Sequence, residues 1–438
     1  MVKPEQIPFT YPKGLIILSL HKKLHMAIIK PFQGWRPSPA QVAEVASRPY
    51  DVLNSEEARV EAAGNPLSFL HVCKPEIDLP EDIDHYADAV YAKAVENWKN
   101  FQANGTFRLD GTANMYAYRQ IMNGHAQVGL VANSSINDYF DDIIKKHEYT
   151  RPEKENDRIR HMYELQCHPE PVFLTYPDVA GVDAVMQKIV AGTPVYDFTA
   201  EDGIQHTFWL IDQAADVQML EHLFQTEVPF TYIADGHHRS ASSAKVGKRM
   251  AEANPNHTGN EEYNFFLSVI FPSSQLMIMD YNRVVKDMHG LSEEALLARI
   301  GEKFDIEKRS NTYKPEALHT FGLYLNNNWY KLTAKAGTFN DADPIDVLDV
   351  TILSNHLLDP ILGIKDQRTD KRIDFVGGIR GLGELEKRVN SGEMALAISL
   401  YPVSIQQLIN IADSGNVMPP KSTWFEPKLR SGLVVHTF

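Results

Sequence analysis

Cysteine is nearly absent from this chain, and its scarcity excludes two classes of protein. Cys73 and Cys167 are the only cysteines among 438 residues. Two cysteines cannot build the framework of a small disulfide-rich secreted protein, and they lack the C-x-x-C spacing of a zinc site. We therefore expect a reducing, cytoplasmic setting.

Positive charge is also in deficit. The 43 Lys and Arg residues are outnumbered by 57 Asp and Glu residues, and the formal net charge is -14. Such a chain is repelled on average by nucleic acids and by anionic membranes, so we expect neither as a partner. A local basic pocket remains compatible with this charge.

Long apolar runs are missing as well. The longest run near the N-terminus covers residues 15–20, far short of the roughly 20 residues that span a bilayer. The basic residues 21–23 that follow it are the wrong flank for a secretory signal. Because the sequence from Met26 to Phe32 reads like the beginning of a protein, we interpret residues 1–25 as an N-terminal extension.

What is present is the pattern of a mixed α/β protein, long enough for two or three domains of roughly 150 residues each. The turn Asn123-Gly124 lies between two β-rich runs and predicts a hairpin, and residues 67–72 read as a strand. We expect a phosphate-binding region over residues 26–288 and a C-terminal α/β region over 289–438. Helical patterns cover residues 81–104, 214–225, 291–303, 383–391 and 405–413.

The most informative segment is Asp235-Gly236-His237-His238-Arg239. It follows an apolar, β-rich run and precedes an alanine-rich run, so we expect it at a strand-to-helix turn. The first turn of a helix presents unpaired N–H groups and partial positive charge, which suit a phosphate. Gly236 lets the backbone approach a ligand closely, and Arg239 can grip phosphate oxygens. An ordinary turn with histidines at a helix start is the alternative.

A second charged segment, residues 145–158, contains His147, Glu148 and five basic side chains. This composition can bind phosphate while supplying a general base or a metal-ligating carboxylate. A solvated helix face is the alternative. The pair His147-Glu148 is not the H-E-x-x-H zinc motif, since position 151 is not a histidine.

Two more segments carry candidate site residues. Residues 418–433 hold Lys421, Ser422, Thr423 and Lys428 between prolines but lack the glycines of a Walker A loop. Apolar residues within this segment favour a structured loop that returns to the site over a frayed end. Asp51, in a turn after Pro49, is a candidate base or metal ligand, or simply the cap of the next helix.

Taken together, six ordered elements resemble the family known as domain of unknown function 1015. Residues 235–239 are also similar, more loosely, to the phosphate-binding box of the ParB and sulfiredoxin superfamily, which includes free-serine kinases. This resemblance implies a ParB/sulfiredoxin-like nucleotide-binding core. His237 stands where sulfiredoxin has its reactive cysteine, which argues against sulfinic acid reduction. The six elements are residues 26–32, 49–52, 65–72, 146–158, 235–239 and 418–433.

These observations favour a nucleotide-dependent phosphotransferase, a small-molecule kinase that uses ATP or ADP with Mg²⁺ and acts on a hydroxyl substrate such as free serine. One alternative is a regulatory module that binds a nucleotide without turnover; another is a metal-dependent hydrolase using His147, His237 and His238. A homodimer is compatible with all three. The candidate catalytic residues are Asp235, which is also the candidate metal ligand, Glu148, Asp51 and His147. The candidate cofactor-binding residues are Gly236, His237, His238, Arg239, Lys421, Ser422, Thr423 and Lys428.

Overall fold

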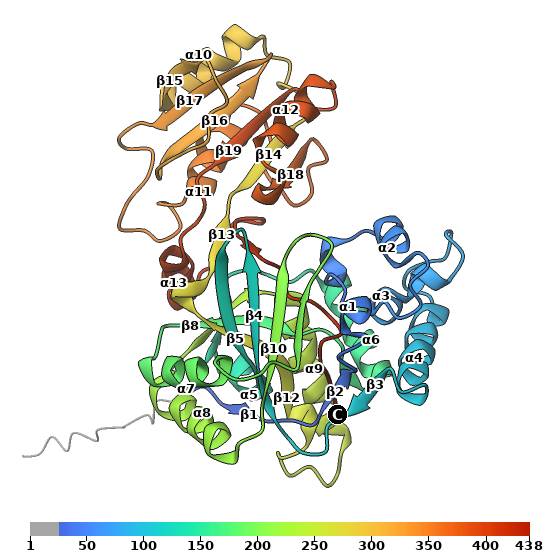
Figure 1. Cartoon of the computed structure of the whole chain (residues 1–438). Helices are drawn as coiled ribbons and strands as arrows, with labels where there is room; N and C mark the ends of the chain where they lie inside the picture. The colour runs from blue at the N-terminus through green and yellow to red at the C-terminus, as the bar shows by residue number, and fades with distance from the viewer. Residues whose placement is uncertain (1–25) are drawn as a thin grey trace, which may run out of the picture.

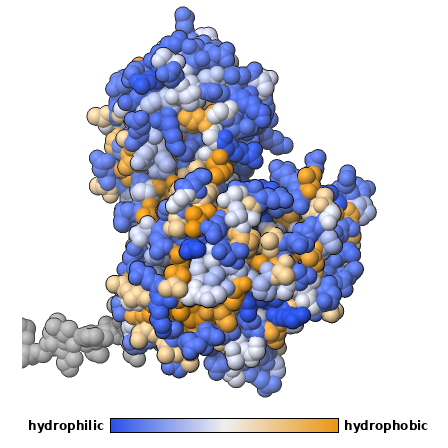
Figure 2. Space-filling view, viewed as in Figure 1, coloured by the Kyte–Doolittle hydropathy of each residue, from blue (hydrophilic) through white to orange (hydrophobic). Residues whose placement is uncertain are grey.

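The computed structural model describes residues 26–438, so the expected extension over residues 1–25 lies outside the described part. The fold is mixed α/β, as the sequence predicted, with β-sheets of nine, six, four and two strands (Figure 1). The face of the molecule in Figure 2 is largely hydrophilic, with apolar side chains gathered in small groups. Among residues 26–438, no helix is both long and apolar enough to cross a membrane.

The nine-stranded sheet carries most of the candidate site. Strands β8 and β12 are parallel to each other, as are β6 and β11, and the other neighbours are antiparallel. Strand β1 (Ile29–Lys30) pairs with β5 outside the main path. The order along the sheet is β6 (Ile144–Lys145), β11 (Thr231–Asp235), β8 (Val172–Tyr176), β12 (Phe265–Pro272), β5 (His125–Ser135), β4 (Met115–Met122), β10 (Gln205–Ile211) and β9 (Tyr196–Thr199).

The predicted hairpin is confirmed by β4 and β5. Met122 pairs with His125 across the turn. Asn123 and Gly124 have φ angles of 52° and 81°. Both central residues of a type I′ turn need positive φ, which Asn and Gly adopt most easily, so this dipeptide sets the hairpin register.

Both faces of the nine-stranded sheet are buried, and strand residues alternate between them. Leu174 of β8 packs in one apolar cluster with Leu220 and Phe224 of α8 (Ala214–Glu227). The next residue in sequence, Phe173, belongs to a second cluster, where its ring lies 5.7 Å from that of Phe425. The C-terminal segment therefore covers part of the sheet face opposite α8.

Further helices complete this region. Helix α6 (Pro152–Leu165) packs against α9 (His237–Ala253), and α7 (Ala180–Val190) packs against α8. Helix α5 (Ile136–Phe140) also contacts α9. The packing of α6 on α9 is the contact that brings two charged segments of the sequence together.

The second large sheet has six antiparallel strands and lies at the top of Figure 1. The change from the first sheet to the second occurs between β12 and β14, while the expected division at residue 288 stays a prediction. Four helices accompany this sheet: α10 (Glu293–Lys303), α11 (Asp349–Leu353), α12 (Leu382–Asn390) and α13 (Ile405–Asp413). The strand order is β15 (Phe304–Arg309), β17 (Asn328–Ala334), β16 (Thr320–Leu325), β19 (Leu396–Leu400), β14 (Tyr281–Val285) and β18 (Ile373–Gly377).

After α13 the chain runs back to the first region. Strand β20 (Trp424–Glu426) pairs with β13 (Met277–Met279). Strand β21 (Val435–Thr437) then enters the four-stranded sheet between β2 (Gly34–Pro37) and β7 (Cys167–His168), with β3 (Phe107–Leu109) at the edge. In Figure 1 the C-terminus accordingly lies beside β2 and β3.

A group of helices lies beside this small sheet: α1 (Val42–Val45), α2 (Ser55–Ala62), α3 (Leu70–Cys73) and α4 (Asp88–Ala103). The predicted strand over residues 67–72 is wrong, because α3 occupies its second half. Asn65 and Ser68 accept hydrogen bonds from backbone N–H groups two residues later, which turns the chain into a helical conformation. A short apolar run fits a buried helical turn as well as a strand. The predicted helices at 214–225, 291–303, 383–391 and 405–413 are confirmed by α8, α10, α12 and α13. The helix predicted over residues 81–104 is confirmed from Asp88 by α4, while residues 81–87 form turns.

Candidate active site

The predicted strand-to-helix turn is confirmed around Gly236. Strand β11 ends at Asp235, α9 begins at His237, and Gly236 between them has a φ of +89°. A Cβ atom on Gly236 would lie 3.0 Å from Nε of Arg239. Both the left-handed backbone and this close approach require glycine here. The hydroxyl of Ser240 donates to the Gly236 carbonyl over 3.0 Å and closes the first turn of α9.

A cleft of about 490 Å³ opens at the N-terminus of α9. Four distant segments meet there: the turn after Pro49, the loop before α6, the β11–α9 turn, and residues 418–433. The six-stranded region adds side chains from β18 and from around α12. The predicted site residues that line the cleft are Asp51, Glu148, Asp235, Gly236, His237, His238, Lys421, Thr423 and Lys428.

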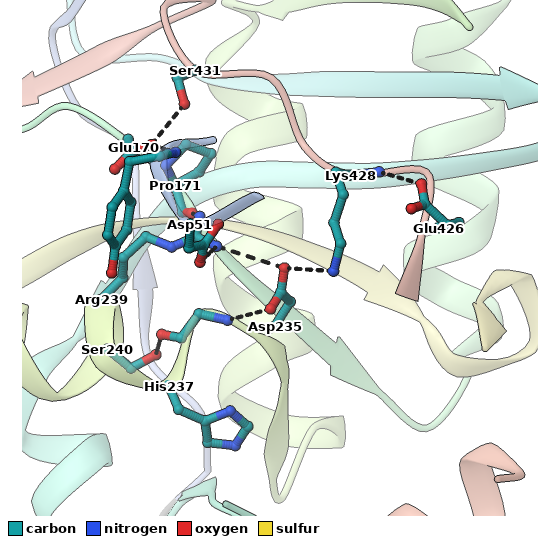
Figure 3. Close-up of polar contacts among 12 residues, drawn as sticks. Asp51, Glu170, Pro171, Asp235, His237, Arg239, Ser240, Glu426, Lys428 and Ser431 are labelled. Atoms are coloured by element: carbon teal, nitrogen blue, oxygen red, sulfur yellow. Dashed lines mark hydrogen bonds and ion pairs between the residues drawn. The ribbon is translucent and has the colours of Figure 1, made fainter. Parts of the chain in front are cut away.

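Arg239 lies behind the cleft wall and does not line it, with 2% of its surface exposed. Its Nη1 donates to the carbonyl oxygen of Pro171 over 2.6 Å. Its Nη2 lies 3.3 Å from Oδ2 of Asp51 and 3.6 Å from Oδ2 of Asp235 (Figure 3). In this arrangement, the guanidinium faces two carboxylates of the cleft, and its predicted contact with phosphate stays a prediction.

Asp235 is held between cations. Nζ of Lys428 lies 3.2 Å from its Oδ2, and the backbone N–H of Gly236 donates to its Oδ1 over 3.0 Å (Figure 3). Burial alone would raise the pKa of Asp235, but Lys428 and Arg239 lower the pKa to about 2. Burial likewise opposes the charge on Lys428, yet Asp235 and Asp51 raise its pKa. Both groups are therefore charged at neutral pH.

His147 and His237 form a buried pair below the cleft surface. Their rings are perpendicular, with centroids 4.4 Å apart. Burial lowers the pKa of His147 to about 4 and holds the pKa of His237 well below its usual value. Both imidazoles are therefore neutral near pH 7. His237 contributes to the lining, whereas His147 lies behind it and accepts a backbone hydrogen bond from Met418 at its carbonyl oxygen over 2.8 Å.

Ser422 also lies behind the cleft surface. It is buried, and its hydroxyl donates to the carbonyl oxygen of Pro419 over 2.6 Å. This bond holds the turn on which Lys421 and Thr423 reach the cleft. The position of Ser422 thus favours a role in loop shape, and its predicted contact with a cofactor stays a prediction.

Glu148 combines a position in the cleft with an altered pKa. Burial, together with the negative charge of Asp235, raises the pKa of Glu148, although Lys421 opposes this effect. One of its carboxylate oxygens lies 3.9 Å from Nδ1 of His237. A carboxylate with a raised pKa accepts a proton more readily near neutral pH, as a general base must.

Several basic residues that sequence reasoning did not assign to the site also line the cleft. Arg151, Lys154 and Arg380 join Lys421 there, and none of the four forms an ion pair with a carboxylate within residues 26–438. Burial lowers the pKa of Lys154, and the charges of Arg151 and Lys421 lower it further. The cleft therefore contains four cations without a salt bridge in the described structure, although Asp51, Glu148, Asp374 and Glu384 also line it. The charge density of residues 145–158 was the available signal for Arg151 and Lys154.

The first turn of a second helix points to the same place. Helix α6 begins at Pro152, and the backbone N–H of Arg151 donates to Nε2 of His238 over 2.9 Å. This hydrogen bond joins the start of α6 to the first turn of α9. Two helix N-termini thus add partial positive charge to the side chains of the cleft.

Glu170 is a further residue that sequence reasoning missed. Its buried carboxylate accepts a hydrogen bond from the backbone N–H of Tyr50 over 2.9 Å and another from the Ser431 hydroxyl over 3.0 Å (Figure 3). Burial raises the pKa of Glu170. The contacts tie residues 418–433 to the turn that carries Asp51. A single glutamate before a proline gave no signal of this role.

Two further spaces share lining residues with the cleft. One, of about 220 Å³, shares Tyr50, Asp51 and Lys154 with the cleft. The other, of about 540 Å³, shares Glu148, Arg151 and Lys421 with it. We call them the Asp51 side cavity and the Glu148 side cavity. The walls of both cavities thus include residues of the cleft wall.

The arrangement does not form a metal site from protein groups alone. Within residues 26–438, no group of three or more His, Cys, Asp or Glu side chains could hold a metal ion. The oxygens of Asp235 already face Lys428, Arg239 and the Gly236 N–H. Mg²⁺ commonly takes one or two carboxylates and completes its shell with phosphate oxygens and water. Mg²⁺ at Asp235 stays a prediction.

Comparisons with known proteins give no activity for this chain. No curated protein matches it. Solved structures that resemble it include a free serine kinase in complex with AMP, with 12% identity, a TM-score of 0.36, and coverage of 68% of this chain and 86% of that one. A conserved hypothetical protein from Pyrococcus furiosus has 13% identity, a TM-score of 0.32, and coverage of 68% and 90%.

A family model gives the clearer result. The model described as "Protein of unknown function (DUF1015)" matches residues 29–351, which is more than half of the chain. The match includes the turn at Asp51, the segment with Glu148 and the β11–α9 turn. The chain therefore belongs to the DUF1015 family.

Proposed function

We propose that the protein is a phosphotransferase that moves the terminal phosphoryl group of a nucleotide such as ATP or ADP to the hydroxyl group of a small substrate such as free serine. The cleft at the start of α9 is the place of transfer. The observation that carries the proposal is the set of four unpaired basic side chains, Arg151, Lys154, Arg380 and Lys421, around two helix N-termini.

The charge of this cleft fits a phosphorylated ligand better than a carboxylate alone. Cations that repel one another bind most favourably to a ligand with several negative charges close together. Backbone N–H groups at the starts of α6 and α9 add donors that suit phosphate oxygens. Phosphoryl transfer depends mainly on positioning and on stabilising the charge of the transferred group, and the cleft supplies both.

A carboxylate beside the cations would supply the general base. Asp51 or Glu148 would orient the substrate hydroxyl and accept its proton. The hydroxyl oxygen then forms a bond to phosphorus while the bond to the bridging oxygen of the nucleotide breaks. The nucleotide leaves with one phosphate fewer, and the carboxylate passes its proton to solvent. Lys421 and Lys428 would hold the phosphates during this exchange.

Turnover is tested directly by phosphorus NMR. The full-length protein is incubated with Mg²⁺, a mixture of amino acids, and ATP, ADP or CTP in separate samples. We expect a new phosphomonoester signal together with loss of the terminal phosphate of one nucleotide. Serine alone replaces the mixture in a second series, because it is the substrate named in the proposal.

Matched variants connect any activity to the cleft. Lys421→Ala removes an unpaired cation from the cleft and should reduce the rate, while Lys99→Ala, on the exposed side of α4, should not. A rate that Lys421→Ala leaves unchanged would contradict the proposed place of transfer. Tight nucleotide binding without any phosphorylated product would instead support the non-catalytic regulatory module.

A further inference from the structure

The Glu148 side cavity has an apolar wall beside its charged groups. Ile345, Ile364 and Met418 give it an apolar wall, and Asn355 adds an exposed amide. Charged side chains line both spaces, and in this cavity Asp359, Lys365, Asp366 and Arg368 accompany the apolar wall. Sites for the organic part of a ligand combine apolar surface with polar groups that fix its orientation.

Two side chains of the cavity lack the contacts that residues of their kind usually make. Thr351 is 8% exposed, and its Oγ1 has no hydrogen-bond partner within residues 26–438. A buried hydroxyl without a partner is unfavourable, and a polar ligand atom in this cavity would complete its hydrogen bonding. At the rim, the ring of Tyr149 is 72% exposed. An exposed aromatic ring beside an apolar cavity suits stacking on a flat ligand.

The cavity wall also contains an unusual helical turn. Residues Ser354–Leu358 form a π-helix directly after α11. Single π-turns are rare and often occur at functional sites. This turn places Ser354 and Asn355 at the cavity, one turn from Thr351.

We propose that the Glu148 side cavity holds the nucleoside of the phosphoryl donor. The inference rests on the proposed function, and it fixes which end of the nucleotide lies in which space. With the nucleoside beside Thr351, the phosphates pass Arg151 and Lys421, the residues shared with the cleft, and end near the Asp51 side cavity. The acceptor then occupies the Asp51 side cavity.

This direction decides between the two candidate bases. Asp51 lines both the cleft and the cavity of about 220 Å³, whereas Glu148 lies on the nucleoside side. The base must reach the acceptor hydroxyl, so Asp51 takes this role. Glu148 is then a positioning residue at the junction of nucleoside and phosphates.

The test compares ligands with and without a nucleoside. Calorimetry measures the affinity of the full-length protein for ADP, CDP and inorganic tripolyphosphate, each with Mg²⁺. We expect Tyr149→Ala and Thr351→Val each to weaken the binding of the preferred nucleotide about tenfold, since base stacking and a hydrogen bond each contribute on that order. Tripolyphosphate affinity should stay unchanged in both variants. Lys421→Ala should weaken all ligands.

The outcomes separate the two proposals. Nucleotide binding that neither Tyr149→Ala nor Thr351→Val alters overturns the nucleoside assignment but leaves the proposed function standing. Equal weakening of ADP and tripolyphosphate also overturns it, because the residues would then act on the phosphates. A protein that binds none of the ligands refutes both proposals. Because the Tyr149 ring is mostly exposed, Tyr149→Ala should fold normally, and its melting temperature checks this.

Discussion

Replacing Arg239 tests whether this residue supports the cleft from behind. Its guanidinium contacts the Pro171 carbonyl, Asp51 and Asp235 from a nearly fully buried position. Breaking a buried ion pair by removing one partner costs about 3–5 kcal/mol. Because Asp235 keeps Lys428 at 3.2 Å and Asp51 is partly exposed, we expect Arg239→Met to lose about 3 kcal/mol of unfolding free energy.

Arg239→Lys separates charge from geometry. A lysine keeps the positive charge but cannot direct donors toward three acceptors, so it should lose about 2 kcal/mol, the value of one hydrogen bond to a charged group. Urea unfolding followed by tryptophan fluorescence measures both losses. Arg309→Met, which removes an exposed partner of Glu307, is the matched control and should change stability by about 0.5 kcal/mol or less.

Stability and binding must be compared in the same variants. If Arg239 supports the cleft from behind, replacing it should lower the unfolding free energy, while tripolyphosphate affinity should fall only slightly in Arg239→Lys. If Arg239 instead binds phosphate, its replacement should leave the unfolding free energy unchanged and lower tripolyphosphate affinity tenfold or more. Our account of Arg239 is refuted if Arg239→Met unfolds at the same urea concentration as the unchanged protein.

Three further changes test other parts of the site. Gly236→Ala should cost about 1–2 kcal/mol in urea unfolding, because its φ is +89° and the added Cβ would meet Arg239; unchanged stability would argue against this backbone conformation. Folding lowers the pKa of His147 from 6.5 to about 4, so between these pH values only the unfolded chain binds a proton at this residue. The unfolding free energy should therefore fall by about 3 kcal/mol as the pH falls from 6.5 to 4. His147→Gln should remove this part of the pH dependence. Lys421→Ala should weaken tripolyphosphate binding about tenfold in calorimetry at low salt, and an unchanged affinity would remove Lys421 from the phosphate site.

Local features of the site could be predicted from the sequence. The turn at Gly236 was predictable because a β-rich run, a glycine and an alanine-rich run follow one another within a short segment. The hairpin at Asn123-Gly124 was predictable for a similar reason, since two residues determine the turn type. The prediction of a strand over residues 67–72 was wrong because a short apolar run without clear periodicity fits a strand and a buried helical turn equally well.

Long-range contacts set the rest of the site and could not be predicted in this way. The ion pair of Lys428 with Asp235 joins residues 193 positions apart, and that of Arg239 with Asp51 joins residues 188 apart. An arginine in a helix start looks the same in the sequence whether it faces a phosphate or two carboxylates. Only the fold shows that Asp51 and Asp235 lie beside the guanidinium of Arg239.

The acidic composition of the chain and a binding site for anions are compatible because they act over different distances. The net charge of -14 slows the approach of an anion, but ions in solution screen this effect beyond about 8 Å at physiological ionic strength. Inside the cleft, Asp235 is already neutralised by Lys428 and Arg239, while Arg151, Lys154 and Lys421 make no salt bridge within residues 26–438. The inner pairs thus fix the geometry of the cleft, and in the proposed function the outer cations would attract the phosphates. Burial lowers the pKa of Lys154 most, and the charges of Arg151 and Lys421 lower it further; a bound phosphorylated ligand would offset that repulsion and raise the pKa of Lys154.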